Sequence, residues 1–281
     1  MQADFHIHST CSDGSFTPEQ LVRIFQQFGY HMLVLTDHDT IAGFQRFHEA
    51  AKACGIKTVS GVEITALYRG AEMHILAYNF DPQDEGLNEL LAEIRRLRVE
   101  RVLEMLEKLR KVGYHLEYED VVAQASGEVL NRRHVALALL YRGYIKTIRD
   151  AFTYDLIADN GRAYLPARSF PPEVIIESVK KAGGIAVVAH PGTFVYPSGE
   201  VGLKESDLRY LIDCGLDGIE VFHPRHTTID VYRYHYIARN FRLFMSFGSD
   251  YHEGEIVNIQ QAIPPDFRSG LREWLNILEC F

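Results

Sequence analysis

The sequence has no long apolar segment and little cysteine. None of its apolar runs approaches the about 18 to 20 residues that a membrane-spanning helix needs. Its first residues also lack the basic and apolar regions of a secretory signal. The four cysteines are scattered, without a CxxC pair, at Cys11, Cys54, Cys214 and Cys280. This pattern argues against a disulfide scaffold and a thiolate metal site, so we expect a cytoplasmic protein with no membrane contact.

Positive charge is also in deficit. The 281 residues include 29 Lys and Arg against 38 Asp and Glu, a net charge of −9. This balance disfavours nucleic-acid binding through a broad basic surface. An anionic substrate is still compatible with it, because bound divalent cations reverse the local field. The chain is long enough for one large α/β domain or for a domain with an insertion.

Strand-like and helix-like segments alternate up to residue 78 and again after Pro171. Strands are predicted, with amphipathic helices between most of them, at 5–8, 32–36, 57–64, 72–78, 185–191, 218–222 and 243–250. This alternation predicts an α/β fold with parallel strands and helices outside. The segment between these two parts differs, because it carries a long amphipathic helix ending near Gly113 and further helical stretches. We therefore predict a helical insertion at about 82–165.

His6 and His8 are the most informative pair in the chain. They lie two residues apart in a predicted strand, so their side chains point to the same side. Two imidazoles directed at one point are typical metal ligands. An HxH pattern alone is more often just two polar residues on a strand, so the other histidines and carboxylates must decide.

Residues of metal-binding type recur at the predicted strand ends. Most of them, together with Glu220, lie at or just beyond the C-terminal end of a predicted strand, where β/α barrels build their sites. His74 lies within its strand and would reach the same centre if that strand runs antiparallel. The candidate ligands are His6, His8, Asp13, His38, Glu63, His74, His190, Asp250 and His252. This set is too large for one ion. It fits two or three ions of Mn²⁺, Fe²⁺ or Zn²⁺ and suits Ca²⁺ poorly, because its oxygen ligands are few.

These residues lie in motifs that resemble those of the polymerase and histidinol phosphatase (PHP) family of metal-dependent phosphoesterases. The motifs are His6-Ile7-His8 with Asp13, Leu35-Thr36-Asp37-His38-Asp39, Gly61-Val62-Glu63, His74, Ala189-His190-Pro191 and Gly248-Ser249-Asp250-Tyr251-His252. They occur in family order along nearly the whole chain. The resemblance implies a distorted (β/α)₇ TIM-like barrel made by residues 1–81 and 166–281, with the helical insertion 82–165 capping the active site.

The resemblance also implies how three metal ions divide the ligands. Manganese is the preferred metal, and Zn²⁺, Fe²⁺ or Mg²⁺ are the alternatives. The division is His6, His8, Glu63 and Asp250 for the first ion, Asp13, His38 and His252 for the second, and Glu63, His74 and His190 for the third. Glu63 would thus bridge two of the ions.

Within the family, the likeness is to the stand-alone branch that acts on nucleotides, with its 3′,5′-nucleoside bisphosphate phosphatases and 5′-3′ exoribonucleases. Asn131-Arg132-Arg133-His134 resembles the Gly-Arg-Pro-His segment of that branch. His226 matches a histidine of a second branch motif. The chain departs from these patterns at Asn131, Arg133 and Glu253, where Gly, Pro and Gly are usual.

The resemblance implies metal-assisted hydrolysis of a phosphate ester. The expected catalytic residues are Asp13, His38 and His226. Arg132 would hold phosphate through a bidentate contact, while His134 and His226 would contact phosphate or protonate the leaving oxygen. The preferred substrate class is a 3′,5′-bisphosphonucleotide, such as adenosine 3′,5′-bisphosphate converted to AMP. The 5′ end of short RNA is a second expected substrate.

Three other functions compete with this one. A histidinol-phosphate phosphatase would use the same centre, and the Arg132 and His134 segment weighs against it. A non-catalytic PHP module, as found in polymerases, could lack part of the ligand set, which is complete here. An amidohydrolase would usually need a bridging lysine, and no lysine stands at a predicted strand end. We expect no obligate protein partner.

Overall fold

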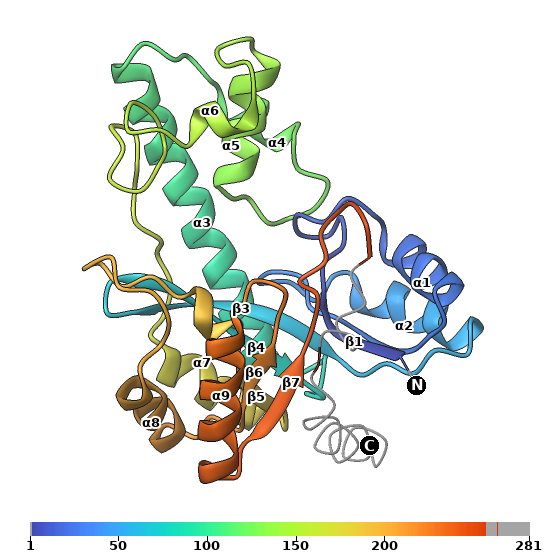
Figure 1. Ribbon diagram of the computed structural model, residues 1–281. Helices are drawn as coiled ribbons and strands as arrows, with labels where there is room; N and C mark the ends of the chain where they lie inside the picture. Colours follow the sequence, from blue (N-terminus) through green and yellow to red (C-terminus); the bar gives the residue numbers. More distant parts are fainter. Residues whose placement is uncertain (1, 257–262, 264–281) are drawn as a thin grey trace.

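The strands of the computed structural model form two sheets (Figure 1). The model describes residues 2–256 and residue 263. The smaller sheet pairs β1 (Gln2–Ile7) in parallel with β2 (Tyr30–Leu35). The larger sheet contains, in chain order, β3 (Gly61–Tyr68), β4 (Ala71–Tyr78), β5 (Ile185–Val188), β6 (Gly218–Phe222) and β7 (Phe244–Phe247).

The strand of His74, β4, departs from the parallel arrangement expected for the other strands and takes the antiparallel direction left open for it. This strand is antiparallel to β3 and to β5, whereas β5, β6 and β7 are parallel to one another. The cause is a two-residue turn at Arg69 and Gly70, whose φ angles are 49° and 81°. Two consecutive positive φ angles are typical of the tight turn that closes a β-hairpin, and a hairpin reverses the chain without a crossover helix. The reversal allows His74 to face the same centre as the residues of the parallel strands.

The hairpin also corrects the predicted position of Glu63. The strand expected at 57–64 begins at Gly61 and continues to Tyr68, so Glu63 is its third residue and does not lie near its C-terminal end. Glu220 likewise lies in the middle of β6. Both side chains enter the centre from within a strand, between apolar neighbours.

Isolated bridges link the two sheets at both gaps. Beyond β7, Tyr251 pairs with Ile7 of β1, and beyond β2, His38 pairs with Glu63 of β3. Backbone hydrogen bonds support both links, from His8 N to Tyr251 O and from Asp39 N to Glu63 O, each 2.9 Å long. The predicted α/β class is therefore confirmed. Among the described residues the strands do not form the continuous ladder of a closed barrel.

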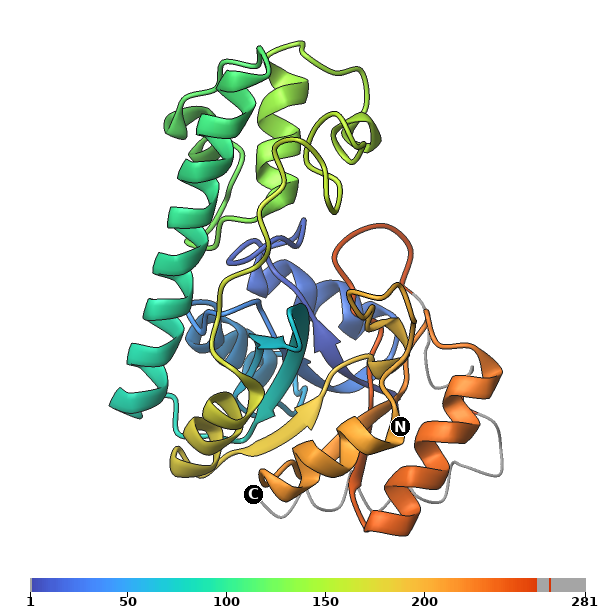
Figure 2. The same cartoon turned by 90° about the vertical axis from the view of Figure 1, so that its left-hand side faces the viewer.

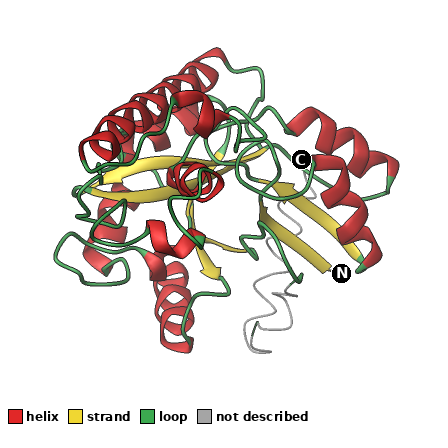
Figure 3. Ribbon diagram, turned by 90° about the horizontal axis from the view of Figure 1, so that it is seen from above, coloured by secondary structure: helices red, strands yellow, loops and turns green. Residues whose placement is uncertain are grey.

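Helices cover the outer faces of the sheets (Figure 3). The smaller sheet packs against α1 (Pro18–Gln27) and α2 (Phe44–Ala53), whose buried side chains join one apolar cluster with it. The larger sheet packs against α7 (Pro172–Lys181), α8 (Glu205–Asp213) and α9 (Thr228–Phe241). The start of α1 follows from local sequence, since Thr17 forms a capping box with Gln20 and Pro18 occupies the first turn.

The segment between β4 and α7 contains helices and no named strand among its described residues. It comprises α3 (Glu85–Lys111), α4 (Tyr118–Val122), α5 (Arg132–Tyr141) and α6 (Ile148–Ala151). Figures 1 and 2 show α3 rising away from the sheets, with the other three helices beside its far half. The first half of α3 packs in the apolar core of the larger sheet through Leu91 and Ile94. The second half contributes Met105 and Leu109 to a separate apolar cluster.

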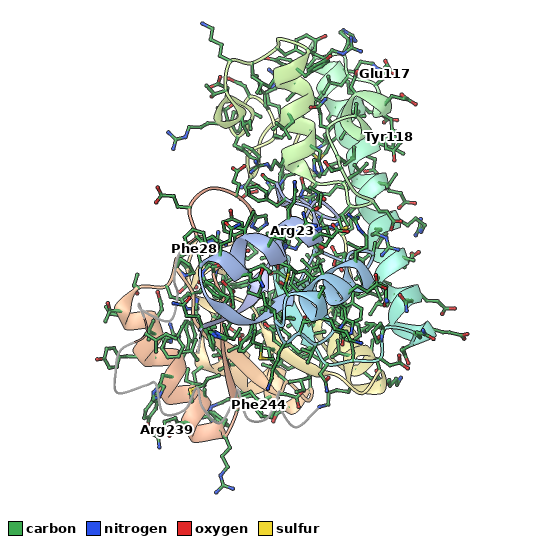
Figure 4. All side chains as sticks on the ribbon, turned by 90° about the vertical axis from the view of Figure 1, so that its right-hand side faces the viewer. Arg23, Phe28, Glu117, Tyr118, Arg239 and Phe244 are labelled. Atoms are coloured by element: carbon green, nitrogen blue, oxygen red, sulfur yellow. The ribbon has the colours of Figure 1, made fainter. Side chains whose placement is uncertain are left out.

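The long axis of the molecule runs from the sheets to this helical segment. Glu117 and Tyr118 lie near its far end, and Arg239 and Phe244 lie at the opposite end (Figure 4). None of the helices in the described part of the chain is both long enough and apolar enough to span a membrane.

Candidate metal centre

Glu63 lies at the middle of the predicted ligands. It is fully buried, and its two oxygens face different histidines. Oε2 lies 3.1 Å from His6 Nε2, 3.2 Å from His8 Nε2 and 3.2 Å from His38 Nδ1. Oε1 lies 3.0 Å from His74 Nδ1 and 2.9 Å from His190 Nε2. One carboxylate therefore contacts imidazoles from both sheets.

Two aspartates complete the cluster. Asp250 Oδ1 lies 3.5 Å from His6 Nε2 and 3.3 Å from His8 Nε2. Asp13 Oδ1 lies 3.1 Å from His252 Nε2, on the other side of His8. The loops after β1 and β7 bring these residues together, and the structure thus gathers all nine predicted ligands in one place.

Three groups within the described residues have ligand atoms close enough to share an ion. They are His6, His8, Glu63 and Asp250; His8, Asp13, His38 and His252; and His38, Glu63 and His74. The first is the predicted group, and the second is the predicted group with His8 added. The predicted third group is also compact, because His190 Nε2 lies 3.4 Å from His74 Nδ1 and 2.9 Å from Glu63 Oε1.

The inward-facing atoms of the cluster are chemically unsatisfied. The buried atoms without a hydrogen-bond partner include His6 Nε2, His8 Nδ1, His8 Nε2, Asp13 Oδ1, His38 Nδ1 and Glu63 Oε2. Unpaired buried polar atoms are costly and rare. Ligand atoms about 2.1 Å from a shared ion are about 3.0 to 3.4 Å apart in octahedral or tetrahedral geometry, which matches most of the separations around Glu63. These residues therefore fit divalent cations.

Carboxylates behind the cluster orient two of the histidines. Glu220 is fully buried; its Oε1 lies 3.0 Å from His6 Nδ1, and its Oε2 accepts a hydrogen bond from His190 N at 2.7 Å. Glu72 Oε1 lies 3.1 Å from His74 Nε2. Such partners fix the tautomer and turn the other ring nitrogen toward the ion. The sequence analysis assigned Glu220 no role; its signal was a glutamate within an otherwise apolar strand.

His223 and Arg225 are further residues that the sequence analysis missed. His223 Nε2 lies 3.4 Å from Asp250 Oδ2, and Arg225 Nη2 lies 2.8 Å from the same oxygen. His223 is 4% exposed, whereas Arg225 lines the cavity described below. Both belong to the motif that contains His226, which is the signal that could have identified them.

Burial and charge shift the pKa values of these histidines in opposite directions. Burial disfavours protonation of His8 and His74, but the surrounding carboxylates outweigh it and raise the pKa of His8 to about 9 and that of His74 to about 10. At His38 burial prevails over the nearby carboxylates and lowers the pKa to about 4. In the metal-free protein at neutral pH, His8 and His74 are therefore protonated and His38 is neutral.

We expect metal binding to release protons and to tighten as the pH rises. A cation needs neutral imidazoles, so it displaces the protons of His8 and His74. The apparent Mn²⁺ affinity should increase about tenfold per pH unit for each displaced proton between about pH 7 and 9. Calorimetric titration in buffers of different ionisation enthalpy measures this release. An affinity that does not change with pH would contradict the assignment.

The stability of the metal-free protein should change in the opposite direction. A pKa raised on folding stabilises the fold fully below the unfolded value of 6.5, and this contribution is lost as the pH rises through the folded values of about 9 and 10. The melting temperature of the metal-free protein should therefore fall over this window, whereas that of the Mn²⁺-loaded protein should not.

A cavity of about 850 Å³ separates the cluster from the helical segment. Its walls include His38, His74 and Asp250 on one side, and Arg101 and Arg132 on the other. The Arg132 guanidinium contacts Asp159 Oδ1 at 2.6 Å and lies 5.5 Å from the ring centroid of Tyr164. Arg132 therefore lies where a phosphate group between the two walls could be bound.

The other two predicted phosphate-binding residues are placed differently. His134 is 4% exposed, and its Nδ1 accepts a hydrogen bond from Asn131 N. In His226, Nδ1 lies 2.9 Å from Val221 O, and Nε2 accepts a hydrogen bond from Gly192 N at 3.1 Å. Neither His134 nor His226 is among the described residues that line the cavity. In both residues a ring nitrogen thus contacts a backbone group, and the direct substrate contact expected of them stays a prediction.

Comparison with known proteins identifies the family. A model of the PHP domain matches residues 4–156. The chain belongs to the PHP family, and the predicted enzyme class, a metal-dependent phosphoesterase, is confirmed.

Three curated relatives match nearly the whole chain. The chain is 35% identical over 249 residues to a 5′-3′ exoribonuclease of Haemophilus influenzae, covering 89% of each protein. It is 34% identical over 275 residues to a phosphoribosyl 1,2-cyclic phosphate 1,2-diphosphodiesterase of Eggerthella lenta, covering 94% of this chain and 100% of the relative. A 3′,5′-nucleoside bisphosphate phosphatase of Chromobacterium violaceum is 30% identical over 275 residues, with 96% and 95% covered.

Solved structures agree with this relationship. A Bifidobacterium adolescentis protein described as a metal-dependent phosphoesterase superposes with a TM-score of 0.81 at 33% identity, covering 91% of this chain and 89% of the other. A Chromobacterium violaceum protein described as an amidohydrolase, with bound sulfate and no metal, gives a TM-score of 0.80 at 27% identity, covering 97% and 96%.

Proposed function

We propose that this protein hydrolyses phosphate esters of nucleotides, with 3′,5′-bisphosphonucleotides preferred and the 5′ end of short RNA as a second substrate. The observation that carries the proposal is the cavity that joins the ligand cluster to Arg132. A cavity of about 850 Å³ lies in the range of small-molecule sites and can accept a mononucleotide. The names of the Haemophilus influenzae and Chromobacterium violaceum relatives support this substrate class.

The centre would hold two or three divalent cations, with Mn²⁺ preferred. Imidazole and carboxylate ligands suit Mn²⁺, Fe²⁺ and Zn²⁺, while Mg²⁺ prefers oxygen. When bound, such cations neutralise phosphate charge and make water a better nucleophile. The proposed ligands are the nine predicted residues in the three groups given above.

The protein's own residues would position the substrate against this centre. Glu63 and Asp250 supply negative charge that retains the cations in a buried site. Asp13 and His38 are the proposed catalytic residues, because both belong to the group that contains His252, and His38 also lines the cavity. Arg132 would bind phosphate from the opposite wall through its planar guanidinium.

We also propose that residues 1–81 and 166–281, of which the structure describes 2–81, 166–256 and 263, form one distorted barrel that is capped by residues 82–165. Support comes from the bridges at both gaps between the sheets and from the separate apolar cluster of the helical segment. Arg101 and Arg132 of that segment line the cavity above the cluster.

Product analysis on a substrate panel tests the function, with inorganic phosphate measured for the phosphomonoesters and the organic products separated by chromatography for the RNA and the cyclic ester. The Mn²⁺-loaded protein should act fastest on adenosine 3′,5′-bisphosphate and leave AMP. The panel includes histidinol phosphate, phosphoribosyl 1,2-cyclic phosphate and a short 5′-phosphorylated RNA. Fastest turnover of either of the first two would overturn the nucleotide assignment, and no turnover of any compound would overturn the proposed phosphoesterase activity.

Replacing Arg132 should weaken substrate binding more than it slows turnover. A charge-assisted contact contributes about 1.5 to 3 kcal/mol, so R132A should raise KM about 10- to 100-fold with kcat changed only a few-fold. R132K should recover part of the loss, because lysine keeps the charge without the bidentate geometry. Steady-state kinetics with R110A as the control, an exposed charge of the same helical segment, makes the comparison. Wild-type KM in R132A would contradict this role.

A further inference from the structure

The loop before α5 reaches down to the segment that follows β1 (Figure 1). At Gly127 the two backbones touch, since a Cβ there would lie 2.1 Å from the carbonyl oxygen of Cys11. Only glycine permits this approach without displacing the backbone. The helical segment is thereby held against the loop that carries Asp13.

Asn131 uses both halves of its amide at this contact. Its Oδ1 accepts hydrogen bonds from Arg133 N at 3.0 Å and His134 N at 3.3 Å, and so caps α5. Its Nδ2 donates a hydrogen bond to Asp13 Oδ2 at 2.9 Å. The orientation of the amide follows from chemistry, because backbone N–H groups require the oxygen and the carboxylate requires the donor.

This hydrogen bond decides which oxygen of Asp13 faces the cluster. With Oδ2 bound to Asn131, Oδ1 is buried without a hydrogen-bond partner and lies 3.1 Å from His252 Nε2. The same asparagine fixes the first turn of α5, which begins with Arg132. One side chain therefore contacts a proposed ligand and caps the helix of the proposed phosphate-binding residue.

A second contact lies beside the first. Arg133 Nη2 is 3.2 Å from both carboxylate oxygens of Glu253, the residue after His252, and Ser15 Oγ donates a hydrogen bond to Glu253 Oε2 at 3.2 Å. Asn131, Arg133 and Glu253 are the three positions at which the chain departs from the motifs it resembles. All three take part in the contact between the helical segment and the centre.

We propose that Asn131 is a positioning residue that couples the helical segment to the cation group of Asp13, His38 and His252. Holding Asp13 Oδ2 presents Oδ1 to the cation, and capping α5 places Arg132 over the same cavity. The inference rests on the proposed function only in requiring that the centre binds cations. Because coupling is reciprocal, cation binding should in turn order α5.

The test compares N131S with D84S. Serine can cap a helix in both places, but it has no atom that reaches Asp13, and Asp84 caps α3 without any contact to the cluster in the structure. Calorimetry with Mn²⁺ alone should show one dissociation constant raised about 10-fold in N131S and none changed in D84S. Hydrogen exchange of residues 132–141 should slow on Mn²⁺ addition in the wild type and in D84S, and not in N131S.

Two results would overturn the proposal. One is wild-type Mn²⁺ affinity in N131S, and the other is an equal loss for every ion, which would indicate a general structural defect. These readouts do not depend on turnover. A wild-type protein that binds Mn²⁺ and hydrolyses no phosphate ester would refute the proposed function and leave this test valid.

Discussion

The E63Q variant should bind fewer Mn²⁺ ions than the wild type and lose roughly 10³-fold in kcat/KM, since cation stabilisation of the reaction amounts to several kcal/mol. Glutamine keeps the size of the side chain and removes its charge. Burial alone would favour the neutral acid, but His6, His38 and His74 hold the pKa of Glu63 well below its ordinary value. The native group is therefore a carboxylate that contacts five imidazoles.

The matched control for this variant is E49Q. Glu49 is exposed on α2, and its carboxylate contacts Gln45 at 2.6 Å. Metal analysis and kinetics of the two variants separate loss of a central ligand from loss of one negative charge. Wild-type metal content and activity in E63Q would show that Glu63 does not bridge the ions.

The second large effect is expected for H38N. His38 Nδ1 is buried, has no hydrogen-bond partner and belongs to two of the three ligand groups. Because burial lowers its pKa to about 4, the ring offers a free lone pair at neutral pH. Asparagine places only a weakly basic amide atom at the position of Nδ1, which is a poorer ligand than an imidazole nitrogen, so we expect kcat to fall by roughly 10² to 10³-fold.

The control for H38N is H31N, which changes an exposed histidine on β2. Mn²⁺ titration of H38N should still detect the group of His6, His8, Glu63 and Asp250, whose atoms do not include His38. Full activity of H38N with its metals bound would refute the catalytic assignment.

The residues that gather in the cluster could be predicted because each lies in a local sequence pattern. His6 and His8 follow from strand periodicity, and His38, Asp250 and His252 follow from the rule that sites form beyond strand ends. The direction of β4 could not be derived in the same way. It depends on the turn at Arg69 and Gly70, whose left-handed geometry is favourable for glycine but unusual for arginine.

The roles of residues that depend on tertiary packing could not be predicted from the sequence. His226 matches a family motif, yet its ring is held between Val221 O and Gly192 N by residues that only the fold brings together. Asn131 lies 118 residues from Asp13, and no periodicity relates them. Motifs that resemble those of the family thus located the cluster, whereas the contacts that orient its side chains follow from tertiary structure.

The most direct test of the central claim is a crystal structure of the Mn²⁺-loaded protein with anomalous scattering data. We expect anomalous peaks between the carboxylates of Glu63, Asp250 and Asp13, each within about 2.0 to 2.4 Å of imidazole nitrogens of the cluster. Two or three peaks there would establish the metal centre. The absence of any peak within the cluster, at Mn²⁺ concentrations that support catalysis, would contradict it.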